Sequence, residues 1–178
     1  TTHGLMCAAN SLDWREGDNV ALFGHEFPAN YWPWKNLERL GVETRIVPLR
    51  PEGPALDDLE ARMDGRTRLA AVSFVGYANG FRIDGARFGD LCRRRGVLAC
   101  LDGIQGLGAV AVRAGEWGID FLSADGHKWL LGPEGYGFLY CSDRVIDQLN
   151  NSMTGWCSRQ IAGDYENYEA PLYPDARR

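Results

Sequence analysis

The sequence predicts an α/β fold in three layers, with a mostly parallel sheet between two layers of helices. Short apolar runs rich in Val, Leu, Ala and Phe are typical of strands that are buried on both faces. Segments with helical periodicity separate these runs, and this alternation indicates βαβ units with right-handed crossovers. The length of 178 residues suffices for one domain with a substantial core.

Each expected element follows from its local pattern. The expected strands are apolar or β-branched runs between turn residues, and they cover residues 19–23, 42–47, 69–75, 97–101, 121–123 and 137–141. The expected helices have apolar residues at helical spacing, and they cover residues 2–14, 31–40, 55–63 and 83–95. Thr2 is the expected N-cap of the first helix, and Gly41 ends the second. The fourth helix ends in Arg93-Arg94-Arg95, where positive charge suits the helix dipole.

Composition excludes several function classes. The net charge is −5 and no Lys/Arg-rich stripe is present, which argues against nucleic-acid binding. No apolar run has the length of a membrane span, and no signal peptide is visible. Five widely spaced cysteines without a CxxC pair predict reduced thiols and no metal site, so a cytoplasmic location is expected.

Lys128 is unusual because the chain holds two lysines and 17 arginines. It lies among apolar residues in a stretch that Gly126 and Gly132 bracket. This setting indicates that an amine is required, because a guanidinium does not lose its proton to become a nucleophile. The alternative is a lysine that extends over the surface from a loop, and the stretch alone favours neither.

Several side chains follow the predicted strands, at the edge where open α/β sheets bind ligands. These residues are Asp102, Gln105, Phe27 and Lys128, together with Tyr77, Ala78 and Asn79, to which we assign no role. Taken singly, Asp102 fits a helix cap, Gln105 a surface amide and Phe27 a hydrophobic staple. Their shared placement favours a single site.

An aldehyde cofactor with a basic ring nitrogen would use all of these groups. Lys128 would form a Schiff base, and Asp102 would keep the ring nitrogen protonated, so that the ring serves as an electron sink. Gln105 could bond a phenolate oxygen, Phe27 could stack on the ring, and Thr2 could hold a phosphate at a helix N-terminus. The glycines at 103, 106 and 108 depart from GxGxxG spacing, so a nucleotide-binding oxidoreductase is the weakest alternative.

Residues 101–108 (LDGIQGLG), 119–122 (IDFL) and 126–135 (GHKWLLGPEG) resemble the class V aminotransferases. This fold-type I group of pyridoxal-phosphate enzymes includes cysteine desulfurases, kynureninases and isopenicillin-N-epimerase-like enzymes. The resemblance extends over nearly the whole chain. Residues 1–4 (TTHG) are similar to the family's phosphate-binding helix start, and residues 26–30 (EFPAN) to its cofactor-stacking segment. The resemblance therefore implies the large domain of a fold-type I transferase.

The resemblance also implies a role for each site residue. It implies Lys128 as the Schiff-base lysine for pyridoxal 5'-phosphate, Asp102 at the pyridine nitrogen, Gln105 near the phenolate oxygen, Thr1, Thr2 and His127 near the phosphate, and Phe27 on the ring. Three positions depart from the family pattern. Cysteine desulfurases usually have histidine where Phe27 stands, many members have Asn at Tyr77, and many have Ser or Thr at Asp125. An aspartate there would repel a phosphate unless it points away, so we assign it no phosphate contact.

By resemblance, we expect the chain to be a fragment of a polypeptide about twice as long. Residues 1–150 would form the cofactor-binding core of the large domain, truncated at its N-terminus, and 151–178 would begin the connection to a C-terminal small domain. The arginine that grips the substrate carboxylate, and any catalytic cysteine, would lie outside the chain.

The expected function is a pyridoxal-phosphate-dependent enzyme that acts on an amino acid. Transamination is the first choice of reaction, with cysteine desulfuration and epimerisation as alternatives within the family. A non-catalytic binding domain that keeps the fold is the alternative of another class. The resemblance further implies a homodimer for the intact protein.

Overall fold

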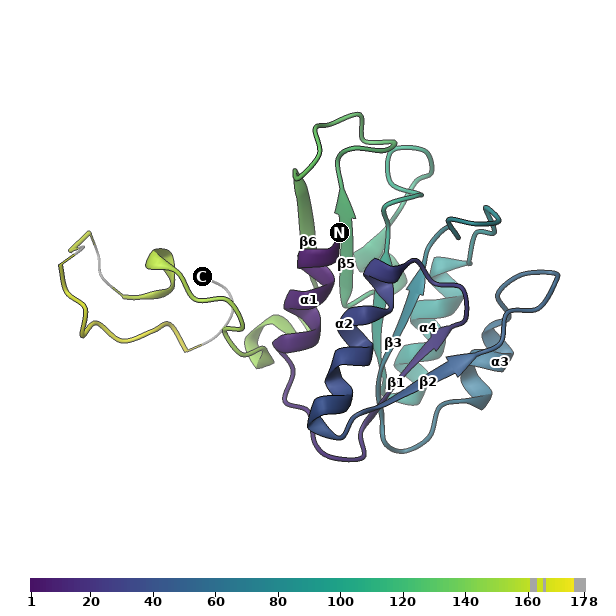
Figure 1. The fold of residues 1–178 in the computed structure, drawn as a ribbon, viewed down its shortest axis with the longest axis horizontal. Helices are drawn as coiled ribbons and strands as arrows, with labels where there is room; N and C mark the ends of the chain where they lie inside the picture. Colours follow the sequence, from purple (N-terminus) through teal and green to yellow (C-terminus); the bar gives the residue numbers. More distant parts are fainter. Residues whose placement is uncertain (161–162, 165, 175–178) are drawn as a thin grey trace.

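The computed structural model describes residues 1–160, 163–164 and 166–174, and it confirms the predicted α/β class (Figure 1). One sheet contains six strands in the order β2-β1-β3-β4-β5-β6. The strands are β1 (Asn19–Phe23), β2 (Glu43–Val47), β3 (Thr67–Ser73), β4 (Leu98–Asp102), β5 (Phe121–Asp125) and β6 (Gly137–Cys141). The first five are parallel, and β6 runs antiparallel to β5.

Helices cover both faces of the sheet, as the three-layer prediction requires. The α-helices are α1 (Thr2–Asn10), α2 (Trp32–Lys35), α3 (Leu56–Ala61), α4 (Gly85–Arg95) and α5 (Ala114–Trp117), and the 3-10 helices are η1 (Pro28–Asn30), η2 (Asn36–Leu40), η3 (Ile146–Gln148) and η4 (Trp156–Ser158). Successive strand residues point to opposite faces. In β1, Val20 and Leu22 therefore pack with α1 and α2, whereas Ala21 and Phe23 pack with α3 and α4.

All four predicted helices have different bounds in the structure, and the first two differ most. The N-cap of α1 is Thr1 and not Thr2, and α1 ends at Asn10 instead of Trp14. The chain leaves the helix because the Trp14 indole turns back and donates to the Ala9 carbonyl oxygen at 2.7 Å. The helix expected over 31–40 divides into α2 and the tighter η2, which ends at Gly41 in the left-handed conformation.

The carboxyl ends of two strands also differ by two residues from the prediction, and both lie near the site. β3 ends at Ser73 and not at residue 75, because Val75 pairs with Arg82 across a turn. β5 runs on to Asp125, since its last residue still pairs with Gly137 of β6. The short helix α5 has no counterpart among the predicted elements.

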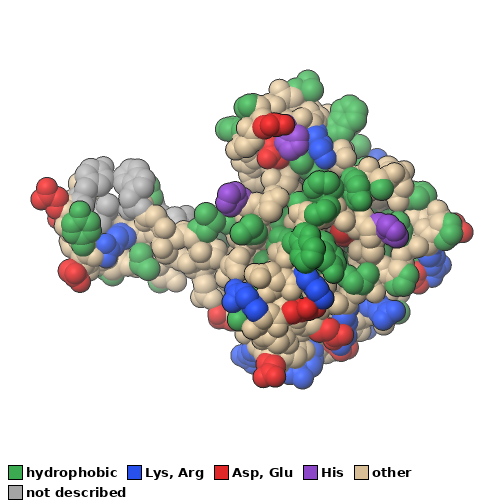
Figure 2. Space-filling model, in the orientation of Figure 1, with side chains coloured by type: hydrophobic (Ala, Val, Ile, Leu, Met, Phe, Trp, Pro, Cys, Tyr) green, Lys and Arg blue, Asp and Glu red, His purple; other side chains and the backbone are tan. Residues whose placement is uncertain are grey.

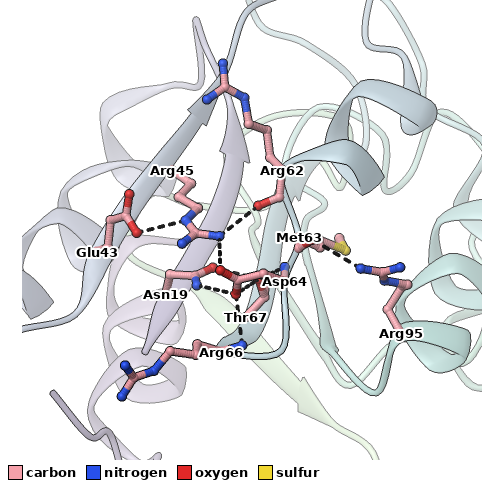
Figure 3. Close-up of polar contacts among 9 residues, drawn as sticks. All are labelled: Asn19, Glu43, Arg45, Arg62, Met63, Asp64, Arg66, Thr67 and Arg95. Carbon is pink, nitrogen blue, oxygen red and sulfur yellow. Dashed lines mark hydrogen bonds and ion pairs between the residues drawn. The ribbon is translucent and has the colours of Figure 1, made fainter. Parts of the chain in front are cut away.

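A polar cluster fixes the amino ends of three strands, at the edge away from the carboxyl ends (Figure 3). Asp64, before β3, accepts from Asn19 Nδ2 of β1 at 3.0 Å and pairs with Arg45 Nη1 of β2 at 2.7 Å. The Thr67 hydroxyl donates to Asn19 Oδ1 at 2.7 Å. The Asn19 hydrogen bond, the Arg66 backbone amide and Arg45 lower the pKa of Asp64. These contacts hold the strands in register.

After β6 the chain leaves the sheet, and its described part lies to one side of the domain (Figure 1). This part contains η3 and η4 and an isolated bridge between Arg159 and Leu172. The predicted connection over 151–178 includes residues 161–162, 165 and 175–178, which lie outside the described residues, so the division at residue 150 stays a prediction. Among the described residues, no helix has the length and apolar character needed to cross a membrane.

Candidate active site

The sheet register brings the predicted site residues to one edge. Asp102 is the last residue of β4 and pairs in register with Ser73 of β3 on one side and Ser123 of β5 on the other. The loop that carries Lys128 begins directly after β5. The loop that carries Phe27 follows β1, which neighbours β3. These segments meet because parallel strands bring their carboxyl ends to the same edge.

The carboxyl group of Asp102 is buried, with 2% of the residue exposed. Its Oδ1 accepts from the Ile104 backbone N–H at 3.0 Å, whereas Oδ2 has no hydrogen-bond partner among the described residues. Burial raises the pKa of Asp102 to about 6, against the opposing effects of the Ile104 hydrogen bond and the positive charge of Lys128. A buried carboxylate oxygen without a donor is unfavourable, so this atom points to a missing cationic or N–H donor.

Lys128 lies in a loop that closes on itself. The Gly126 N–H donates to the Tyr136 carbonyl oxygen at 2.6 Å, and the Gly132 N–H donates to the Gly126 carbonyl oxygen at 2.8 Å. A Cβ atom on Gly126 would lie 2.8 Å from the Tyr136 oxygen, so only glycine fits. The two glycines that bracket Lys128 in the sequence are therefore hydrogen-bonded to each other where its loop begins and ends.

A second close contact joins the Asp102 and Lys128 segments. Gly108 has a φ of +92°, and a Cβ atom there would lie 2.9 Å from Leu130 N and still closer to the Trp129 carbonyl oxygen. A Cβ atom on Gly103 would likewise lie 2.7 Å from a methyl carbon of Leu107. The glycines after Asp102 thus serve close packing, which explains their departure from a nucleotide-binding pattern.

The Phe27 ring lies between two other predicted residues. The Lys128 Nζ atom is 5.8 Å from the centre of the ring, and the Tyr77 ring meets it edge-on at a centroid distance of 5.2 Å. Phe27 and Tyr77 are 43% and 47% exposed, so both rings remain accessible. Asn79 has a local role, because its Oδ1 accepts from the Phe81 N–H at 3.1 Å within the turn after β3.

The start of α1 lies against β5. The Ser123 hydroxyl donates to the Thr1 carbonyl oxygen at 2.9 Å, and the Thr1 hydroxyl is buried without a partner among the described residues. Thr1 and Thr2 line an open cavity of about 400 Å³ together with Asp125. The Asp125 carboxylate lies 3.0 Å from His127 Nδ1, and hydrogen bonding to His127 lowers the pKa of Asp125. The Asp125 carboxylate, which would repel a phosphate if it faced one, thus lies at the cavity wall and contacts His127.

Two parts of the site were not among the predicted residues. Glu26 accepts hydrogen bonds from Ser73 and Asn30, which joins the loop after β1 to the end of β3. The contact of Gly108 with the Lys128 loop is the other. An acid three residues after a buried strand was the available signal for Glu26. Gln105 lies half-buried in the loop after Asp102, and its predicted contact stays a prediction.

Exposed hydrophobic side chains lie on the loop between β5 and β6 and, below this loop in Figure 2, over the start of α2. On the loop, Trp129 is 56%, Tyr136 72% and Leu131 90% exposed. Single exposed hydrophobic residues are ordinary, but a group of large ones on one projecting loop is typical of a surface that another polypeptide covers.

Comparison with curated proteins shows that the chain is similar to cysteine desulfurases. A probable cysteine desulfurase of Methanothermobacter thermautotrophicus is 35% identical over 157 residues, which are 87% of this chain and 39% of that protein. A cysteine desulfurase of Salmonella typhimurium is 36% identical over 154 residues, 84% of this chain and 38% of that protein. The chain thus spans about two fifths of the length of these curated relatives.

Solved structures show the same fold. A cysteine desulfurase from Escherichia coli matches with a TM-score of 0.88 at 23% identity, over 99% of this chain and 44% of that one. A substituted form of C-DES, with glycine covalently linked to its PLP cofactor, matches with a TM-score of 0.87 at 25% identity, over 98% of this chain and 47% of that one. The family model for aminotransferase class-V matches residues 1–170. The resemblance seen in the sequence is thereby confirmed, and the chain belongs to the class V aminotransferase family.

Proposed function

We propose that the intact protein is a pyridoxal-phosphate-dependent enzyme that acts on an amino acid, with Lys128 as the residue that holds the cofactor aldehyde. The observation that carries this proposal is the buried Asp102 Oδ2 atom, which has no donor within the described part of the chain and lies near the loop that carries the Lys128 amine. The relatives named above support the same cofactor, because C-DES binds PLP.

The residues present fit this cofactor. Bound pyridoxal phosphate supplies an electron sink for carbanion chemistry at the substrate Cα. Asp102 Oδ2 would accept from the protonated ring nitrogen, which gives this buried oxygen a hydrogen-bond donor. Phe27 would cover one face of the ring, and Lys128 Nζ, once released by the incoming amine, would move the proton at Cα.

The start of α1 is the proposed phosphate site. Its N-terminal N–H groups offer hydrogen-bond donors, and so does the buried Thr1 hydroxyl, which has no partner among the residues that the structure describes. Thr2 lines the same cavity. His127, next to Lys128, would add a donor, and its contact with Asp125 would direct the aspartate charge toward the imidazole instead of the phosphate. Gln105 is proposed at the phenolate oxygen of the ring.

Transamination remains the first proposed reaction, and cysteine desulfuration is the second. The desulfurase relatives at 35% and 36% identity favour the second. Phe27 argues against it, because cysteine desulfurases usually have histidine at this position. The relatives are more than twice as long as this chain, so residues outside it would select the reaction.

The test is the visible absorption spectrum of the full-length protein with pyridoxal phosphate, before and after borohydride. Wild type should show a band that borohydride removes, and Lys128→Ala should lack it. A wild-type protein without such a band would contradict the enzyme proposal and favour a non-catalytic binding domain. Incubation with single amino acids, followed by assays for keto acid and sulfide, then separates transamination from desulfuration.

We also propose a homodimer and a cytoplasmic location for the intact protein. The exposed loop residues Trp129, Leu131 and Tyr136 support a subunit contact, since their burial would remove large apolar side chains from water. The free thiols of Cys92 and Cys100, both buried, support a reducing compartment. Light scattering of the full-length protein tests the first proposal, and the location of a fluorescent fusion in cells tests the second.

A further inference from the structure

Glu26 forms a hydrogen-bonded anchor beneath the candidate site. Its Oε1 accepts from the Ser73 backbone N–H at 2.9 Å, and its Oε2 accepts from the Ser73 hydroxyl and from Asn30 Nδ2, the latter at 2.9 Å. Burial raises the pKa of the Glu26 carboxyl, and the hydrogen bonds from Ser73 and Asn30 oppose this rise. A buried carboxylate is tolerated when its oxygens are satisfied, so these donors must stay in place around it.

The backbone around Glu26 turns sharply. His25 has a φ of +64°, an unfavourable conformation for a residue other than glycine. This turn directs the Glu26 carboxylate toward β3 and leaves Phe27 at the surface. Such a conformation persists only where surrounding contacts fix it. The Gly24 N–H, which donates to the Val47 carbonyl oxygen at 2.7 Å, fixes the loop before the turn, and Glu26 fixes it after the turn.

The partners of Glu26 connect it to the rest of the site. Ser73 is the register partner of Asp102, and the next backbone N–H, that of Phe74, donates to the Asp102 carbonyl oxygen at 2.9 Å. In the other direction, Asn30 Oδ1 accepts from Trp34 Nε1 at 3.1 Å, within the buried face of α2. One carboxylate thus joins the loop that carries Phe27 to the strand beside Asp102.

We propose that Glu26 is a positioning residue, whose hydrogen bonds to Ser73 and Asn30 set where the Phe27 ring lies relative to Asp102 and Lys128. The inference rests on the proposed function, since the position of this ring matters for a planar aromatic cofactor that lies against it. Phe27 contacts the cofactor in this arrangement, and Glu26 acts through Phe27 without a contact of its own.

The experiment is a double-mutant cycle on pyridoxal-phosphate affinity, measured by absorbance titration of the full-length protein. The variants are Glu26→Ala, Phe27→Ala and the double variant. Each single substitution should weaken binding about tenfold, the effect of losing one well-placed aromatic contact. The double variant should bind no more weakly than the weaker single variant, because both changes remove the same interaction. Thermal unfolding of the cofactor-free variants reports their folding separately.

Two further variants sharpen the cycle. Glu26→Gln keeps an acceptor for the Ser73 N–H but presents an amide to the donors of Asn30 and the Ser73 hydroxyl, so an intermediate loss is expected. It replaces Glu26→Ala in the cycle if that variant fails to fold. Glu38→Gln, at an exposed acid paired with Lys35, is the matched control and should bind as wild type does. Losses that add to about a hundredfold in the double variant overturn this proposal alone. A wild-type protein that does not bind pyridoxal phosphate overturns the proposed function as well.

Discussion

Replacing Asp102 by Asn should stabilise the cofactor-free protein at neutral pH. The carboxylate is buried, its Oδ2 has no donor among the described residues, and its pKa rises from 3.8 to about 6. Asn preserves the acceptor for the Ile104 N–H and matches the shape of the protonated acid without its charge. The difference between the two pKa values corresponds to about 3 kcal/mol, because a tenfold change in proton affinity is about 1.4 kcal/mol.

The direction of this pH dependence is set by whether the folded or the unfolded chain binds the Asp102 proton more tightly. The folded protein holds the Asp102 proton more strongly than the unfolded chain does, so protonation stabilises the fold. That contribution is fully present below pH 3.8 and is lost as the pH rises through about 6. Relative to Asp102→Asn, wild type should therefore lose up to about 3 kcal/mol of unfolding free energy between pH 4 and pH 7.

Urea unfolding of the cofactor-free, full-length protein at several pH values between 4 and 8 measures this difference. The control is Asp57→Asn, at an exposed acid in the first turn of α3, whose difference from wild type should stay nearly constant with pH. A difference between wild type and Asp102→Asn that also stays constant from pH 4 to pH 7 would contradict the raised pKa of Asp102.

Two other substitutions test the candidate site, and a third tests an ion pair at the amino end of β5. Lys128→Ala should abolish the borohydride-reducible band in the absorption assay, whereas Lys35→Ala, at an exposed ion pair, should keep it. If both variants behave alike, Lys128 does not hold the cofactor. In urea unfolding, Gly108→Ala should lower the free energy of unfolding by more than about 2 kcal/mol, and Gly80→Ala by about 1 kcal/mol. Both glycines have positive φ, but only at Gly108 would a Cβ atom meet backbone atoms, so similar losses would contradict that contact. Asp120→Ala should lower the free energy of unfolding by about 3 kcal/mol, because it removes a carboxylate that is 1% exposed and leaves Arg144 and Ser142 without this partner. A loss below about 1 kcal/mol would contradict a stabilising role for these contacts.

Much of the fold could be predicted because its determinants are local. The runs at 19–23 and 137–141 were predicted with the bounds that the structure has, since turn residues bracket both. The end of α1 could not be predicted in this way. Trp14 continues the apolar spacing of the helix, but its indole N–H bonds the Ala9 carbonyl oxygen and lies outside the helix. A side chain that bonds the helix backbone thus overrides periodicity.

In the candidate site, too, some features could be predicted from the sequence and others could not. Asp102, Lys128 and Phe27 could be predicted to converge, because the carboxyl ends of parallel strands meet at one edge of the sheet. The role of Glu26 could not, because its main partner, Ser73, is distant in sequence and becomes its neighbour when β1 and β3 pair. The packing of Gly108 on the Lys128 loop likewise depends on how two loops meet in space.

The burial of Asp102 should make its contribution to cofactor affinity depend on pH. Only the ionised carboxylate forms a charge-assisted hydrogen bond with a protonated ring nitrogen. A pKa of about 6 leaves roughly a tenth of Asp102 ionised at pH 5 and nine tenths at pH 7. The affinity ratio of wild type to Asp102→Asn should therefore increase about tenfold between pH 5 and pH 7. Titration with pyridoxal phosphate at both pH values measures it, with Gln105→Ala as the control, since an amide does not titrate. An unchanged ratio would mean that Asp102 is not the partner of the ring nitrogen, and that its unpartnered oxygen serves another ligand.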